Sequence, residues 1–280
     1  MKNICIKNML LIITGSIILI SCYKSFDSKD YRPTFTIGGY ASSSDIGAGH
    51  LVGYWAFDGS YIDSISRATG TPVNTGFTTG FKGQALQGAA NGYVIYDLPA
   101  AIKNLKSFTI DFWINTAQNT NGIITPVCIS NDADFWGALD FFYENGSTAS
   151  SASFKVHYGW QQKNNWFPSG ILANPWNAWQ NIAVTYNAAT STFNMYQGGS
   201  LVTGGSQTVA GLGNVAFPAG ANKIIFGTEQ FQCTPSIGTS GGPQGWADYL
   251  KGQMDEVRVY DVALTASDLQ ALVILQGKGK

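Results

Sequence analysis

The sequence predicts an all-β domain, a two-sheet antiparallel jelly-roll sandwich with one short helix at its C-terminus. Runs of alternating apolar and polar residues recur along the chain, separated by turns rich in Gly, Asn and Asp. Aromatic residues reach 13% while charged residues are only 12%, a composition that suits an extracytoplasmic β-sandwich. One large core can form after about residue 50, and neither a second domain nor an internal repeat is visible.

The predicted strands follow one another at short spacing. Leu51–Asp58 is the first, and the Asp58-Gly59-Ser60 turn closes it. Ser107–Asn115 is a long strand in which apolar residues alternate with Thr109, Asp111 and Trp113. The other strands before the C-terminal segment are expected at residues 93–96, 123–130, 136–143, 154–158, 179–186, 192–196 and 223–227.

The C-terminal segment predicts a strand that leads into a helix. The side chains of residues 252–260 follow the period of two that is typical of a strand. One face is expected to carry Gln253, Asp255, Val257 and Val259, and the other Met254, Glu256, Arg258 and Tyr260. Thr265 and Asp268, three positions apart, match the capping box that opens a helix.

This segment resembles the LamG-like jellyroll family within the concanavalin A-like lectin and glucanase superfamily. There, a G-x-[IM]-D-E-V-R-[VI]-Y strand runs into an A-L-[ST]-x-x-[DE]-[LI] helix, and Gly252–Leu269 matches every specified position. Tyr54–Gly59, Gly83–Gly88 and Trp179–Tyr186 resemble three further family motifs. The resemblance covers about Leu51–Leu272 and implies a concanavalin A-like sandwich, but it says little about the ligand.

The N-terminus has the pattern of an export signal over residues 1–21. Lys2 and Lys7 accompany the apolar run Met9–Ile20, and Leu-Ile-Ser-Cys follows. This ending resembles the lipobox of bacterial lipoproteins, which implies that Cys22 becomes the lipidated first residue. A secretory signal with an incidental Cys is the alternative.

The polar residues 22–49 predict a flexible tether, which leaves 50–280 as the folded domain. We therefore expect the protein in the cell envelope, where its lipid attaches it to a membrane. The expected membrane is the outer membrane of a Gram-negative bacterium. The membrane face stays open. The net charge of −1 and the lack of a basic cluster argue against nucleic acid as a partner.

The best candidates for ligand binding are aromatic. They lie within residues 128–175, where no family motif can be placed. Sugars stack their C–H faces on aromatic rings and bond their hydroxyls to amides. The candidates for binding a glycan or polysaccharide are Trp136, Trp160, Trp166, Tyr158 and Asn164. Packing of a long loop under the sandwich is the alternative use of these rings. A protein-binding or adhesion domain that contacts other surface proteins is the alternative function.

Catalysis is not expected. The paired carboxylates of a glucanase usually alternate on one strand as E-x-D-x-x-E, and this run is missing. Asp140 and Glu144 come nearest, whereas Asp255 and Glu256 are adjacent and should face opposite sides of a strand. A glycoside hydrolase is therefore the third hypothesis.

The family resemblance also implies a structural calcium ion, held by Asp58, Asp63 and Asp255. In the alternative, Asp58 closes a turn and Asp255 accepts hydrogen bonds from backbone amides. Cys128 and Cys233 form the one pair of Cys left after the export signal and the anchor. They either form a disulfide or stay as two buried thiols.

Overall fold

The computed structural model describes residues 35–160, 163–166, 170–239 and 241–280, with the backbone alone for 163–165. Cys22 and the predicted signal peptide lie outside the described residues. One compact unit spans Thr36–Lys280. None of the helices in the described ranges is both long and apolar enough to cross a membrane.

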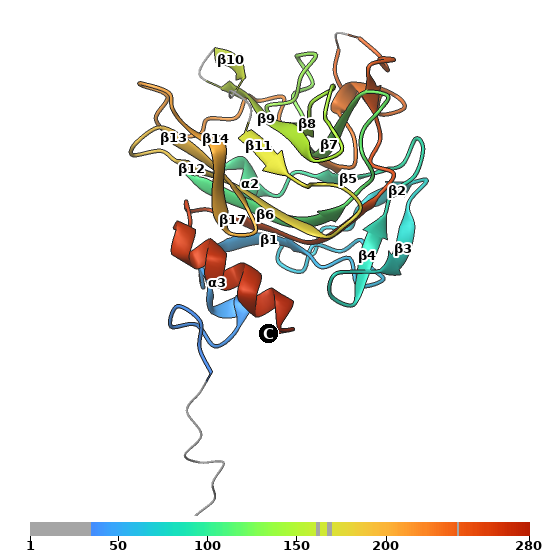
Figure 1. The fold of residues 1–280 in the computed structure, drawn as a ribbon. Coiled ribbons are helices and arrows are strands. Elements are labelled where there is room, and N and C mark those ends of the chain that lie inside the picture. The colour runs from blue at the N-terminus through green and yellow to red at the C-terminus, as the bar shows by residue number, and fades with distance from the viewer. Residues whose placement is uncertain (1–34, 161–162, 167–169, 240) are drawn as a thin grey trace, which may run out of the picture. The chain divides into compact units, whose positions relative to one another are not determined.

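Two sheets of mainly antiparallel strands face each other (Figure 1). The helix-side sheet contains β1 (Leu51–Trp55), β3 (Gly76–Thr79), β4 (Gln84–Gln87), β6 (Phe108–Asn115), β12 (Gln180–Asn187), β13 (Thr192–Gln197), β14 (Ser200–Thr208) and β17 (Gln253–Tyr260). The opposite sheet contains β2 (Thr71–Val73), β5 (Tyr93–Asp97), β7 (Ile123–Ile129), β8 (Leu139–Tyr143), β9 (Ser151–Trp160), β10 (Lys163–Trp166), β11 (Gly170–Ala173), β15 (Lys223–Phe226) and β16 (Ala247–Asp248). The helical segments are η2 (Ser43–Asp45), α2 (Ala100–Lys103), η3 (Gln230–Gln232) and α3 (Ala266–Gly277). This architecture confirms the predicted all-β sandwich with a C-terminal helix.

Strand β17 is central to the helix-side sheet. It pairs with β6 on one edge, and with β4 and β1 along its other edge. In the opposite sheet the order is β2, β5, β15, β7, β8 and β9, and β9 pairs with both β10 and β11. β16 runs parallel to β7, and β11 contacts β14 where the two sheets meet.

The core lies between the two sheets and follows from the alternation of their strands. Phe108, Ile110 and Phe112 of β6 are buried in the same cluster as Val127 of β7 and Phe141 of β8. A strand sends alternate side chains to opposite faces. The residues between these apolar positions therefore point away from the core, and on the opposite sheet they form the candidate site described below.

The alternation predicted for β17 is wrong at one point. Met254, Val257 and Val259 all belong to the core, although Met254 was expected on the other face. The pairing of β17 with β6 shifts between Asp255 and Arg258, and Glu256 has a φ of 51°. One additional residue in a strand forms a bulge, which changes the phase of the alternation beyond it.

The predicted boundary between tether and domain is also wrong, because residues 36–49 belong to the folded unit. Tyr40 Oη donates to Asp268 Oδ1 at 2.8 Å, and Arg258 Nη1 donates to the Ser43 carbonyl at 3.1 Å. Ile46 is buried in the apolar cluster that contains Leu269 and other residues of α3. Chain before residue 50 covers an apolar surface of the helix that would otherwise face water.

Helix α3 begins as predicted. The Thr265 side chain accepts from the Asp268 amide, and the Asp268 carboxylate accepts from the Thr265 amide, which completes the capping box. Leu269, Leu272 and Leu275 pack against Tyr260 of β17. The helix thus covers the outward face of the helix-side sheet.

Candidate functional site

A row of side chains crosses the outward face of the opposite sheet. Cys128 of β7 lies opposite Asp140 of β8, Asp140 lies opposite His157 of β9, and His157 lies opposite Trp166 of β10. Residues at the same register position project from the same face of a sheet. Four chemically distinct groups therefore stand side by side on strands that a rigid sheet holds.

An aromatic pocket of about 260 Å³ opens at the Trp166 end of this row. Its lining residues are Ile123, Trp136, Phe142, Glu144, Asn145, Lys155, Trp166 and Trp246. Trp166 is 41% exposed and Trp246 is 40% exposed. The rings of Trp136 and Trp166 stand nearly perpendicular, with centroids 4.5 Å apart. The pocket thus presents indole surfaces in more than one orientation.

Charged and polar groups lie beside these rings. Lys155 Nζ donates to Glu144 Oε2 at 2.5 Å, and each side chain is nearly one third exposed. Asn145 Nδ2 donates to the Trp246 carbonyl at 3.5 Å. The pocket can therefore contact an apolar ligand surface and offer both hydrogen-bond donors and acceptors at its edge.

A buried polar layer supports the pocket from below. His157 Nδ1 lies 2.7 Å from Asp140 Oδ2, and both side chains are at most 1% exposed. The centroid of the His157 ring lies 4.6 Å from that of the Trp166 ring and 5.8 Å from that of the Trp136 ring. The imidazole is thus fixed by a carboxylate on one side and touches two pocket walls on the other.

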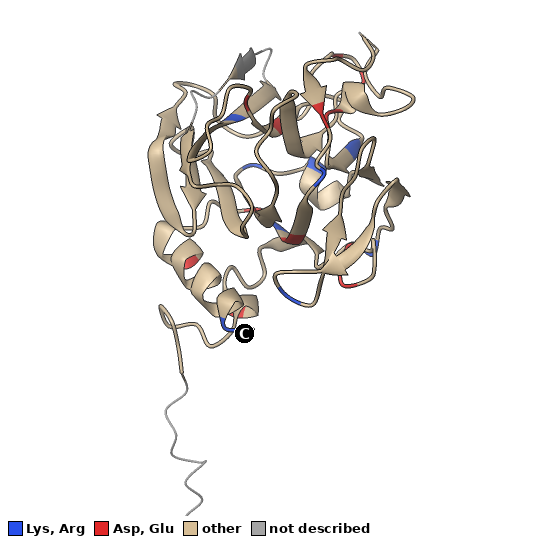
Figure 2. Ribbon diagram, turned by 45° about the vertical axis from the view of Figure 1, so that its right-hand side comes forward, with Lys and Arg blue, Asp and Glu red and all other residues tan. Residues whose placement is uncertain are grey.

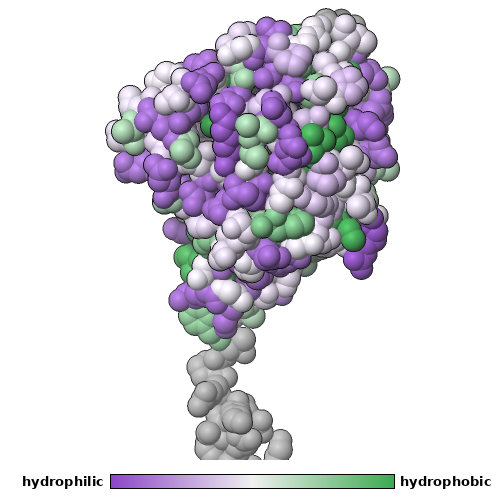
Figure 3. Space-filling model, turned by 90° about the vertical axis from the view of Figure 1, so that its right-hand side faces the viewer, coloured by the Kyte–Doolittle hydropathy of each residue, from purple (hydrophilic) through white to green (hydrophobic). Residues whose placement is uncertain are grey.

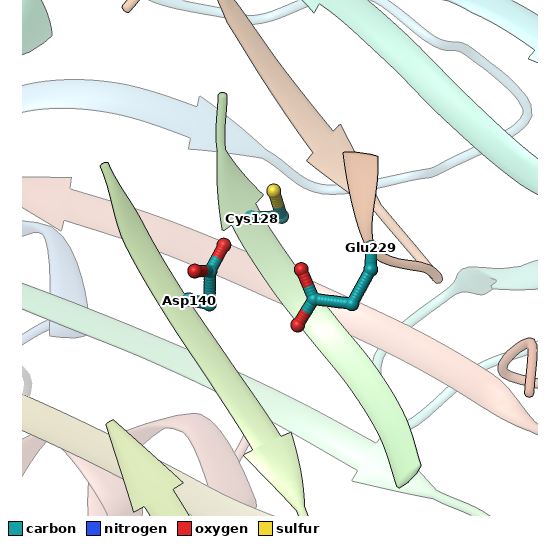
Figure 4. Close-up of side chains that lie close together, drawn as sticks. All are labelled: Cys128, Asp140 and Glu229. Atoms are coloured by element: carbon teal, nitrogen blue, oxygen red, sulfur yellow. The ribbon is translucent and has the colours of Figure 1, made fainter. Parts of the chain in front are cut away.

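Glu229, which follows β15, completes the buried layer. Thr125 Oγ1 donates to Glu229 Oε1 at 2.8 Å. Figure 4 shows Cys128 and Asp140 on neighbouring strands, with the Glu229 carboxylate reaching toward them. Burial, together with the nearby Asp140 carboxylate, holds the pKa of Glu229 well above its usual range. Burial also raises the pKa of the Cys128 thiol.

The structure brings together two of the predicted aromatic residues, Trp136 and Trp166. The prediction for Trp160 and Tyr158 is wrong, because both rings are only 2% exposed and pack in the core near Phe193. They occupy inward positions of β9, which continues two residues beyond its predicted end at residue 158. Asn164 lies in β10, and its side chain lies outside the described residues.

Several residues of the pocket and of the buried layer beneath it were not predicted to take part in a binding site. Asp140, Phe142 and Glu144 are spaced by two, as are Lys155 and His157, so strict alternation along β8 and β9 could have assigned them to one face. Trp246 carries no such signal. It lies far along the chain, in a Gly-rich stretch before β16, and only the tertiary fold brings it to the pocket.

The carboxylates predicted to hold calcium each accept backbone hydrogen bonds. Asp63 accepts from the amides of Tyr54, Ile65 and Ser66. Asp58 accepts from the Gln84 amide at 2.7 Å, and Asp255 from the Lys82 amide at 2.9 Å. In the described part of the chain, the three do not form a close group of metal-ligating atoms, whereas Cys128, Asp140 and Glu229 do. Calcium binding stays a prediction.

Cys128 and Cys233 are free thiols, and both are buried. Cys233 Sγ donates to the Glu229 carbonyl at 3.7 Å. Of the two alternatives, buried thiols rather than a disulfide describe this structure.

Charged residues are few, 12% of the chain. Figure 2 shows residues of both signs spread over the ribbon. On the face seen in Figure 3, hydrophilic residues predominate and hydrophobic residues form small separate spots. Among the Trp residues of the described ranges, Trp166 and Trp246 are the two exposed ones.

Comparison with solved structures finds the same fold in domains of low sequence identity. The binding domain of Paraclostridial Mosquitocidal Protein 1 matches with a TM-score of 0.59 and 16% identity, over 80% of this chain and 52% of that one. Domain 4 of an extracellular arabinanase from Geobacillus stearothermophilus, solved with arabinotriose, matches with a TM-score of 0.56 and 16% identity, over 80% of this chain and 98% of that one. The botulinum neurotoxin serotype D ligand-binding domain, solved with N-acetylneuraminic acid, matches with a TM-score of 0.55 and 13% identity, over 83% and 52%. The chain spans about half the length of the two toxin structures.

Sequence similarity links the chain to a protein family. No curated protein sequence matches the chain. The family profile described as the concanavalin A-like lectin/glucanases superfamily matches residues 87–270, which include most strands of both sheets and the beginning of α3. This match confirms the family resemblance of the C-terminal segment, and the chain belongs to the concanavalin A-like lectin/glucanase superfamily.

Proposed function

We propose that this protein binds carbohydrate in the aromatic pocket and does not cleave it. One observation carries the proposal. Two partly exposed indoles, Trp166 and Trp246, line a concave site together with a Lys155–Glu144 pair. Indole faces stack on the C–H faces of sugars, and the charged groups can bond to hydroxyls.

The structural neighbours support this class of ligand. The arabinanase domain was solved with arabinotriose and the botulinum domain with N-acetylneuraminic acid. A botulinum binding domain was also solved with rat synaptotagmin II, so the same fold serves protein recognition. The concave shape and mixed polarity of the aromatic pocket favour a glycan over a broad protein surface.

The buried acids support a non-catalytic role. A glycoside hydrolase places two carboxyl groups on either side of a sugar bond, about 5 to 9.5 Å apart. Glu144 is the one acid among the lining residues of the pocket, and Asp140 and Glu229 in the layer beneath it are 0% and 1% exposed. Asp140 also bonds to His157. Neither carboxyl group is open to a substrate.

We further propose that the domain acts at the cell envelope, attached through a lipid on Cys22. The lipobox-like Leu19–Cys22 sequence supports this anchor. Cys22→Ala should release the protein from the membrane fraction or leave its signal uncut. A variant that stays with the membranes, with no lipid on Cys22 of the wild type by mass spectrometry, would contradict the anchor.

The binding proposal is tested with Trp166→Ala. We expect this change to weaken binding to the preferred oligosaccharide of a glycan panel by about thirtyfold, which equals roughly 2 kcal/mol for the loss of a central aromatic contact. Titration calorimetry measures the binding, and circular dichroism measures the melting temperature. Trp179→Ala is the matched control, because Trp179 is a partly buried indole near Phe81, outside the pocket.

If both variants weakened oligosaccharide binding equally, or if Trp166→Ala did not weaken it, the aromatic pocket would not be the binding site. Incubation of the wild type with the bound polysaccharide tests the second half of the proposal. A release of reducing ends that Asp140→Asn abolishes would show that the protein is a hydrolase.

A further inference from the structure

The buried layer beneath the aromatic pocket contains a second candidate site. We propose that Cys128, Asp140 and Glu229 together bind one divalent transition-metal ion, of which zinc is the representative. This site is independent of sugar binding, since none of its three ligands lines the pocket.

The spacing and burial of the three residues support a shared ion. One ligating atom from each lies within 4.8 Å of the other two. Their side chains are 0%, 0% and 1% exposed. Exposed acidic groups gather on many protein surfaces without a ligand, but taking ionised carboxylates out of water without compensation is costly.

The hydrogen bonds divide each carboxylate into a held oxygen and an unpaired one. His157 binds Asp140 Oδ2, and Thr125 donates to Glu229 Oε1. Within the described part of the chain, Asp140 Oδ1 and Glu229 Oε2 are buried and have no hydrogen-bond partner. Metal-ligating carboxylates are commonly oriented in this way, by an outer partner on the oxygen that does not bind the ion.

The ligand set selects the class of ion. A thiolate with two carboxylates combines sulfur and oxygen, which zinc accepts in a four-coordinate site. Calcium prefers 6 to 8 oxygen ligands and is disfavoured by the thiol. The fourth position would be taken by a further ligand such as water.

Protonation is the competing explanation. If Glu229 retains its proton, it can donate to Asp140 and satisfy both unpaired oxygens without an ion. The charged and titratable groups around the cluster are His157, on Asp140 Oδ2, and Cys233, whose thiol donates to the Glu229 carbonyl. The two explanations differ in metal content and in the effect of replacing Glu229.

The test uses the untagged protein, refolded separately with Zn²⁺ and with Co²⁺ and then desalted. We expect about one ion per chain by elemental mass spectrometry, and a thiolate-to-cobalt charge-transfer band in the near ultraviolet. Cys128→Ser should remove the band and lower the bound metal at least tenfold. Glu229→Gln should lower it similarly.

Cys233→Ser is the matched control, since Cys233 is a second buried thiol in the same apolar cluster as Cys128. It should retain both the ion and the band. The cobalt spectrum of the wild type tests the proposal even if a variant fails to fold.

A wild type that binds neither ion would overturn the metal site, as would metal content that Cys128→Ser leaves unchanged. In that case, a Glu229→Gln variant as stable as the wild type would assign the cluster to proton sharing. Loss of sugar binding in Trp166→Ala leaves the metal test unaffected, so the two proposals can fail separately.

Discussion

The two outward faces of the sandwich bury acidic groups in different ways. On the helix-side sheet, Arg258 Nη2 lies 2.9 Å from Glu256 Oε2, and Tyr54 Oη donates to Glu256 Oε1 at 2.6 Å. On the opposite sheet, Asp140 and Glu229 are paired with no Lys or Arg in the described part of the chain. The helix-side face therefore neutralises Glu256 with a permanent cation of the protein. The other depends on protons or on an ion from outside.

The largest expected effect comes from removing the arginine that pairs with Glu256 on the helix-side sheet. Arg258→Met leaves the buried Glu256 with only the more distant Lys82 ammonium at 4.0 Å, and should lower the free energy of unfolding by about 3 to 5 kcal/mol. Urea denaturation measures this change. Lys223→Met is the control, because the Lys223–Asp97 pair is exposed and should contribute about 1 kcal/mol or less. Similar losses in both variants would mean that burial does not distinguish the two ion pairs.

Asp111 tests the same face through pH. Burial raises its pKa to about 7, whereas an unfolded Asp titrates near 4. The folded state therefore binds the additional proton, and the stability that Asp111 contributes is lost as the pH rises from about 4 through 7. Asp111→Asn should remove part of this decline, by roughly 4 kcal/mol between pH 4 and pH 9 at about 1.4 kcal/mol per pKa unit. Parallel stability curves for wild type and variant, from urea titrations across this range, would contradict the assignment.

Calcium tests whether the helix-side sheet also depends on an external ion. If Asp58, Asp63 and Asp255 hold calcium in the folded state alone, an ion concentration of a hundred times Kd should stabilise the protein by about 2.7 kcal/mol. A chelator should then lower the melting temperature, and Asp255→Asn should abolish the response. An unchanged melting curve with chelator would mean that the three carboxylates bind backbone amides and no calcium.

The smallest expected effect is at the start of α3. Thr265→Ala removes the oxygen that accepts the Asp268 amide and should cost about 1 kcal/mol of stability. Ser267→Ala, in the first turn, removes a hydroxyl that bonds to Thr265 Oγ1 but not to the backbone amide, and should cost less. Thermal unfolding of both variants decides whether the capping box stabilises α3, the helix that covers the outward face of the helix-side sheet.

The sequence was most informative where local alternation and the core agree. Strand β6 lies within one residue of its predicted bounds, because its apolar side chains follow the period of a strand facing a core. Strand β17 was placed equally well, but the bulge at Glu256 was not foreseen, since a positive φ at a non-Gly residue depends on tertiary contacts.

The candidate site was less predictable for a physical reason. Trp160 and Trp166 look alike in the sequence, yet the first lies in the core and the second in the pocket. The pairing of β9 with β10 decides this difference. Glu229 approaches Asp140 across about ninety residues of chain, a long-range contact that no local motif encodes.

The pairing of the first strand with the last has a consequence for how the chain folds during its synthesis. β1 binds β17 some two hundred residues later, and the Ser43 amide bonds to the carbonyl of the terminal Lys280. Contacts between such distant residues slow folding into the millisecond-to-second range. Until β17 arrives, the edges of β1 and β6 lack their partner and can pair with other chains. The emerging protein thus carries two open edges until its last strand is available, which gives a chaperone a period in which to hold it.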